Sequence, residues 1–84
     1  MSVNLDEIKP DIVHDATGTY CPVPITELAK IIKTAKTGQI IELLADDEGA
    51  IQDVPAWCEA TGNEFLGYKE DDGILIFYVR KTQE

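Results

Sequence analysis

The 84-residue chain has little cysteine, histidine or basic side chain. It contains two cysteines, Cys21 and Cys58, and a single histidine. Disulfide-stapled secreted domains carry far more cysteines, and a zinc site usually takes four ligands in close pairs. The sequence also lacks a glycine-rich phosphate-binding loop. We therefore expect free thiols, no metal site and no cofactor.

Charge and hydropathy exclude two further classes of protein. The chain carries 7 basic against 16 acidic residues, a net charge of −9. Nucleic-acid binders show the opposite balance, because phosphate contacts need Lys and Arg. We expect no direct nucleic-acid binding, and docking onto basic partner surfaces instead. No stretch reaches the ~20 apolar residues of a membrane span. The N-terminus has no apolar core typical of a secretory signal, so we expect a cytoplasmic protein.

The length fits one small domain. Hydrophobic residues make up 44% of the sequence, which is normal for a globular protein. Residues 1–9 show no clear period and are expected to form a partly mobile arm. Residues 10–82 are expected to form the single domain.

The periodicity predicts alternating strands and helices. Strands are expected over residues 11–15, 39–45, 64–70 and 74–81, with Asp71-Asp72-Gly73 as a hairpin turn. Helices are expected from Pro22 to about Thr37, before Gly38, and over residues 50–61. The resulting order is β-α-β-α-β-β. Right-handed crossovers then give an α/β (α+β) two-layer sandwich, with two helices on one face of a mixed four-stranded sheet.

Two features of these elements leave alternatives open. Pro55 is costly inside a helix, so the second helix is expected to begin near Asp53, or to be kinked in its first turn. The last strand is apolar on both faces, with Ile76 on one and Phe77 on the other. Either a partner or a second copy shields part of the second face, or the strand is simply central. Phe77→Glu is the substitution that distinguishes the two, because an interface on this strand would be lost.

Cys21 is the main candidate for chemistry. Pro22 and Pro24 fit the first turn of the helix, where a missing N–H costs no hydrogen bond. The residue before a proline avoids the α region, so Cys21 is expected at the N-cap. The first-turn N–H groups and the helix dipole stabilise a thiolate there. A cysteine before a helix can equally be a small buried apolar residue.

The residues before Cys21 are expected to form the turn that presents it. Gly18 can adopt a positive φ angle. Asp15 is expected to accept hydrogen bonds from this turn, or else to be a solvated strand end. His14 invites a pairing with the cysteine, but neighbouring strand residues face opposite ways, so we interpret it as a surface or packing residue.

The run from Asp15 through Gly18 to Cys21-Pro22-Val23-Pro24 resembles the signature of the TusA/SirA-like sulfur carriers. The resemblance continues through Gly38, Asp46-Asp47, Asp53-Val54-Pro55, Trp57 and Gly62, and so covers nearly everything after residue 10. It implies the same α/β sandwich, with Cys21 as the sulfur-carrying residue. Asp15, Gly18, Pro22 and Pro24 are the supporting residues of the expected site.

The resemblance implies a sulfur carrier that holds sulfur as a persulfide on Cys21. Its expected partners are a cysteine desulfurase or another sulfur donor, and an acceptor protein in tRNA thiolation, cofactor assembly or sulfur metabolism. A stand-alone thiol enzyme would need a Cys-x-x-Cys pair or a nearby base, so a carrier is favoured over an enzyme. The alternative is an interaction or regulatory module in which Cys21 is structural.

Two further features have two interpretations each. Cys58 lies on the apolar stripe of the second helix and is expected in the core, the alternative being a resolving thiol for Cys21. Lys30, Lys33 and Lys36 follow one another at three-residue spacing. They form either a solvated face or a basic strip that helps to dock partners.

Overall fold

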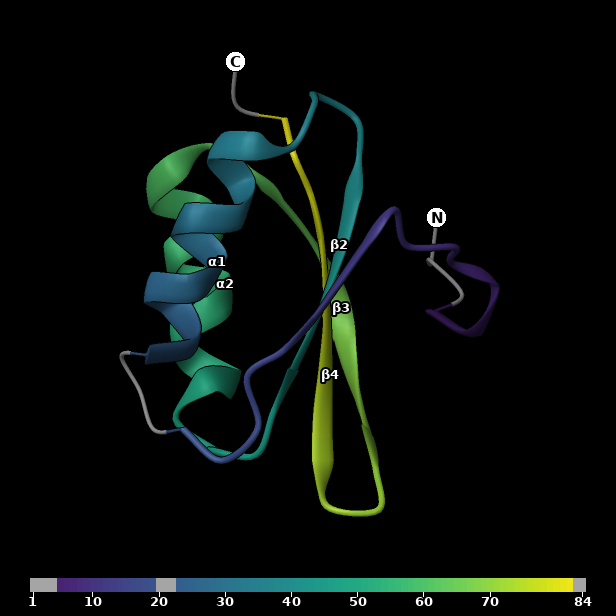
Figure 1. Ribbon diagram of the computed structural model, residues 1–84, viewed down its shortest axis with the longest axis vertical. Helices are drawn as coiled ribbons and strands as arrows, with labels where there is room; N and C mark the ends of the chain where they lie inside the picture. The colour runs from purple at the N-terminus through teal and green to yellow at the C-terminus, as the bar shows by residue number, and fades with distance from the viewer. Residues whose placement is uncertain (1–4, 20–22, 83–84) are drawn as a thin grey trace.

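The computed structural model describes residues 5–19 and 23–82. Its elements, in chain order, are a short 3-10 helix η1 (Leu5–Glu7), β1 (Ile12–Asp15), α1 (Val23–Thr34), β2 (Ile40–Ala45), α2 (Ala50–Thr61), β3 (Glu64–Asp71) and β4 (Ile74–Arg80). Both helices cover the same face of one sheet (Figure 1). The predicted order β-α-β-α-β-β and the two-layer architecture are confirmed.

The four strands lie in the order β1-β2-β4-β3. β1 pairs in parallel with β2, whereas β4 runs antiparallel to both β2 and β3. Because β1 and β2 are parallel, their carboxyl ends meet at one edge of the sheet. The turn after β1 and the segment after β2 therefore become neighbours, although they are about thirty residues apart in sequence.

The core lies between the helices and the alternate residues of the two central strands. Leu43 of β2 and Phe77 of β4 are completely buried, as are Leu28 of α1 and Val54 of α2. The remaining buried apolar side chains continue this layer along the same faces, and they include Ile32, Ile41, Ala45, Leu75 and Val79. Burying a side chain of this size contributes about 1.5–3 kcal/mol, so this layer supplies much of the driving force for folding.

The opposite face of the sheet is partly covered by the N-terminal segment. η1 lies on this side, away from the helices (Figure 1). A Cδ atom of Leu5 lies 3.2 Å from the point that a Cβ atom on Gly67 would occupy, so Leu5 would have to shift to admit a side chain there, and the φ of 137° at Gly67 also favours glycine. On the same face, the Tyr78 hydroxyl donates a 2.7 Å hydrogen bond to Glu42. Residues 1–4 of the expected arm lie outside the described residues, and the mobility expected of residues 1–9 stays a prediction.

The apolar character of β4 on both faces follows from its central place between β2 and β3. Phe77 lies on the helix-covered face with no exposed surface, so it is the wrong residue for testing an interface. Ile76 and Tyr78 occupy the other face. Shielding of that face by a partner stays a prediction.

α1 ends at Thr34, three residues before the predicted end. The N–H of Lys36 donates to the side-chain oxygen of Gln39 at 2.8 Å instead of to a helix carbonyl. The ammonium of Lys81 donates to the carbonyl of Ala35 at 2.7 Å. A side chain far along the sequence therefore satisfies a carbonyl at the end of the helix, and Gly38 serves the turn that follows, with φ of 95°.

α2 spans Ala50–Thr61, the range predicted from the apolar stripe, and the alternative start near Asp53 is wrong. The N–H of Asp53 already donates to the carbonyl of Gly49 at 3.1 Å. Pro55 is the sixth helical residue, and the packing of the apolar stripe outweighs the hydrogen bond that it cannot make. A carboxylate oxygen of Asp47 accepts the N–H of Gly49 at 3.1 Å just before the helix. Gly62, with φ of 79°, ends the helix as predicted.

Candidate functional site

The turn after β1 is closed by hydrogen bonds from its own polar side chains. One carboxylate oxygen of Asp15 accepts the backbone N–H of Thr17 at 2.9 Å and the Thr17 hydroxyl at 2.6 Å. The Thr19 hydroxyl donates to the carbonyl of Ala16 at 2.6 Å. Gly18 has φ of 80°, a conformation that other residues rarely adopt. The hydrogen bonds expected of Asp15 are present, and so is the positive φ of Gly18.

The same turn is attached to the neighbouring strand. The N–H of Ala16 donates to the carbonyl of Leu44 in β2 at 2.8 Å. The N–H of Gly18 donates to a carboxylate oxygen of Asp46 at 3.0 Å. Asp46 follows β2 directly, at the edge where the parallel strands end. Both halves of the turn are therefore tied to the chain around the end of β2.

Cys21 and Pro22 lie outside the described residues, between this turn and α1. The described helix begins at Val23, whose side chain is 40% exposed. Pro24 is fully buried. The start of α1 is thus held against the core by Pro24, while Val23 at the same end is open to solvent.

Hydrogen bonding favours the ionised form of Asp15. The hydrogen bond from the Thr17 hydroxyl lowers the pKa of Asp15 below its ordinary value of 3.8, and the bond from the Thr17 N–H makes the second-largest contribution. His14 adds a smaller attraction in the same direction. A carboxylate at this position keeps the turn closed at neutral pH.

His14 contacts helix α1. Its Nε2 atom lies 3.8 Å from a carboxylate oxygen of Glu27, and both side chains are about one-third exposed. The contact joins β1, which precedes the turn, to α1, which follows the turn in the chain. This accords with our interpretation of His14 as a surface or packing residue.

Cys58 is a core residue, as predicted. It is 1% exposed and belongs to the buried layer between the helices and the sheet. Burial raises the pKa of the Cys58 thiol from 9.0 to about 12. It is therefore protonated at neutral pH, which does not suit a resolving thiol.

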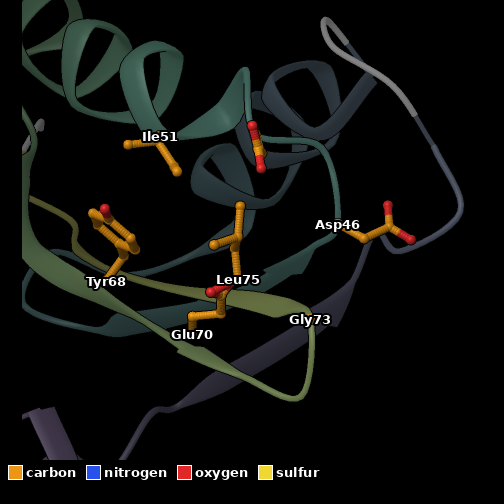
Figure 2. Close-up of a pocket in the computed structure, with 7 residues that line it drawn as sticks. Asp46, Ile51, Tyr68, Glu70, Gly73 and Leu75 are labelled. Atoms are coloured by element: carbon orange, nitrogen blue, oxygen red, sulfur yellow. The ribbon is translucent and has the colours of Figure 1, made fainter.

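A cavity of about 400 Å³ opens beside this edge of the sheet, between the start of α2 and the β3–β4 hairpin. Its walls combine apolar side chains such as Ile51 and Tyr68 with carboxylates, and the lining residues are Asp46, Glu48, Ile51, Tyr68, Glu70, Gly73 and Leu75. Figure 2 shows the carboxylate of Asp46 pointing away from Tyr68 and Glu70. Asp46 thus borders the cavity while its carboxylate serves the turn.

Metal ligands are not grouped in this part of the molecule. Within residues 5–19 and 23–82, no three His, Cys, Asp or Glu side chains lie close enough together to hold a metal ion. Among the same residues, neither helix has the length and apolar character needed to cross a membrane.

The role of Asp46 could not be predicted from its neighbours in the sequence, because its bond to Gly18 spans 28 residues. Asp47 accepts the N–H of Gly49 just before α2, whereas Asp46 reaches the turn before Cys21. The positions of Asp15 and Asp46 in the sequence could have predicted that they lie close together. Asp15 and Asp46 both stand at the ends of apolar strands, and parallel pairing of those strands would have placed them at the same edge.

Comparison with known proteins adds independent evidence. Residues 12–81 match the family model described as Sulfurtransferase TusA. The chain is 40% identical to YrkF of Bacillus subtilis over 77 residues. The aligned region covers 92% of this chain but only 42% of YrkF. The protein named sulfur carrier protein TusA from Pseudomonas putida is 32% identical over 80 residues, covering 95% of this chain and all of the relative.

The fold has a counterpart of solved structure. A SirA-like protein from Desulfitobacterium hafniense superposes with a TM-score of 0.75 at 23% identity. The match covers 86% of this chain and 99% of that protein. At this level of identity the likeness concerns the fold alone.

Proposed function

Because the chain belongs to the TusA sulfurtransferase family, we propose that it is a sulfur carrier that holds sulfur as a persulfide on Cys21. The match of residues 12–81 to the family model carries this proposal. The turn geometry supports it, because Asp15 and Gly18 have the bonding and conformation expected of residues that present a reactive cysteine.

The proposed reaction is sulfur exchange without net oxidation. The Cys21 thiolate attacks the outer sulfur of a persulfide on the donor protein. A new S–S bond forms on Cys21, the donor's S–S bond breaks, and the donor's thiolate leaves with the electron pair. An acceptor thiolate then attacks the outer sulfur on Cys21 in the same way, and Cys21 leaves as the thiolate. The carrier is thereby regenerated.

The placement of Cys21 in the chain suits this exchange. It follows a turn at the edge of the sheet, where Asp15 and Gly18 are exposed, and precedes the exposed Val23. A thiol carried between these residues can enter the active site of another protein. Cys58 is buried and protonated, so it would not compete for sulfur.

The partners follow from the chemistry. A cysteine desulfurase or a rhodanese-type protein would supply the sulfur, and an acceptor in tRNA thiolation, cofactor assembly or sulfur metabolism would receive it. The Pseudomonas putida relative is named as a sulfur carrier, which supports this assignment. A cytoplasmic location belongs to the same proposal.

Intact mass spectrometry tests the function directly. Wild type, Cys21→Ser and Cys58→Ala would each be incubated with a cysteine desulfurase and cysteine, and separately with polysulfide. We expect a gain of one sulfur, about 32 Da, in wild type and in Cys58→Ala. The gain should disappear on reduction and should be absent from Cys21→Ser.

The two sulfur sources separate a wrong donor from a wrong function. Loading by polysulfide alone would keep Cys21 as the carrier residue and point to a different donor protein. If neither source loads wild type, the sulfur-carrier proposal fails and the interaction module becomes the better explanation.

A further inference from the structure

Two carboxylates from adjacent strand ends hold the turn that precedes Cys21. Asp15 ends β1 and accepts two hydrogen bonds from Thr17. Asp46 follows β2 and accepts the N–H of Gly18 at 3.0 Å, across 28 residues of sequence. The first carboxylate closes the turn on itself, whereas the second joins the turn to another part of the chain.

We propose that Asp46 is a positioning residue for Cys21, and that it acts through its hydrogen bond to Gly18. The inference deepens the proposed function and rests on it for its biological meaning. Gly18 precedes Cys21 by three residues, so at most about 11 Å of extended chain separates them. Fixing the N–H of Gly18 therefore limits where the cysteine can lie relative to the start of α1.

The N–H of Gly18 donates to a carboxylate from outside the turn. Gly18 has φ of 80°, and its N–H bonds to Asp46, whereas the other bonds of the turn involve Asp15, Ala16, Thr17 and Thr19. The turn's other bonds hold the residues on either side, since Ala16 is joined to β2 and Thr19 to Ala16. The bond to Asp46 thus anchors the outer part of the turn.

Two other roles for Asp46 fit the geometry less well. The hydrogen bond just before α2 is made by Asp47, which accepts the N–H of Gly49, and α2 has no side-chain cap. A role as a ligand in the neighbouring cavity would need the carboxylate to face the other lining residues. Figure 2 shows it pointing away from Tyr68 and Glu70. The hydrogen bond to Gly18 is the interaction that its orientation serves.

The test compares Asp46→Ala, Asp46→Asn and Glu48→Ala with wild type in the full chain. Asp46→Ala removes the hydrogen bond and the charge, whereas asparagine keeps an oxygen that can accept the same N–H. Glu48→Ala is the matched control, because it removes one negative charge from another residue that lines the cavity and leaves the Gly18 bond intact.

Two measurements report on the position of the turn. The first is the exchange rate of the Gly18 amide proton with water by NMR, which should rise about tenfold in Asp46→Ala. The second is the pH profile of Cys21 alkylation. The rate at pH 7 should change by about threefold, because the turn that precedes Cys21 is no longer fixed at Gly18. Asp46→Asn and Glu48→Ala should both stay close to wild type.

The outcomes separate position from charge. Wild-type exchange and alkylation in Asp46→Ala would overturn the proposal. A change in Asp46→Asn equal to that in Asp46→Ala would assign the effect to charge and would also overturn it. If Asp46→Ala does not fold, Asp46→Glu provides the comparison, because it keeps the charge but displaces the carboxylate. Neither measurement uses a sulfur donor, so failure of wild type to load sulfur overturns only the proposed function.

Discussion

A thiol-specific disulfide reagent, added to the native protein at pH 8, should modify Cys21 rapidly and leave Cys58 almost unmodified. The difference follows from the position of Cys58 in the core, where it is 1% exposed. The reagent reacts with the thiolate, so both ionisation and access to the sulfur control the rate.

The size of the effect follows from the pKa. Burial raises the pKa of the Cys58 thiol from 9.0 to about 12. At a pH below the pKa, raising the pKa by one lowers the fraction of thiolate about tenfold. At pH 8 the buried Cys58 thiol is therefore ionised roughly a thousandfold less than the same thiol in the unfolded chain. Limited access to the buried sulfur slows the reaction further.

The assay counts the released chromophore with time. Native wild type should show one rapidly reacting thiol per chain, and the denatured protein should show two. Native Cys21→Ser should show no rapid reaction and should recover one on denaturation. If Cys58 in native Cys21→Ser reacts within tenfold of its rate in the denatured chain, the assignment of Cys58 to a closed core is refuted.

Three further predictions concern pH and docking. Burial, and to a smaller extent the hydrogen bond to Glu42, raise the pKa of Tyr78 above 10.0. The folded chain therefore loses this proton at a higher pH than the unfolded chain, and the free energy of unfolding falls as the pH rises past 10.0. Tyr78→Phe should flatten this alkaline fall in urea titrations. The pKa of Asp15 lies below 3.8, so its contribution is present above that pH and is lost on further acidification. Asp15→Asn should flatten the acid limb. Lys30→Glu with Lys33→Glu should raise the KM for sulfur transfer severalfold with kcat unchanged, whereas Lys9→Glu should not. An unchanged KM would leave these lysines as a solvated face.

Much of the fold could be predicted because local patterns agreed with one another. The apolar residues of 39–45 and 74–81 predicted strands, and Asp71-Asp72-Gly73 predicted the turn of the hairpin. Gly62 predicted the end of α2. Each of these signals depends on neighbouring residues, so the sequence alone is sufficient to read it.

The errors occurred where distant residues decide the structure. Just after α1, the carbonyl of Ala35 accepts a hydrogen bond from Lys81, which lies 46 residues further along the chain. The start of α2 depends on packing that overrides Pro55. The bond between Asp46 and Gly18 exists only because two strands pair in parallel. Local propensity contains none of this information, whereas strand pairing supplies it.

The topology also decides where other molecules can be attached. β4 runs opposite to β1 and β2, so it ends at the edge of the sheet farthest from the turn after β1 (Figure 1). The backbone of Lys81 is tied there to Gly38 and Gln39 at 2.7 and 2.9 Å. An affinity tag, a fluorophore or a second domain joined after Thr82 would therefore emerge on the side opposite the turn. The turn would stay open to donor and acceptor proteins, and the sulfur-transfer assays can use protein labelled or immobilised at its carboxyl end.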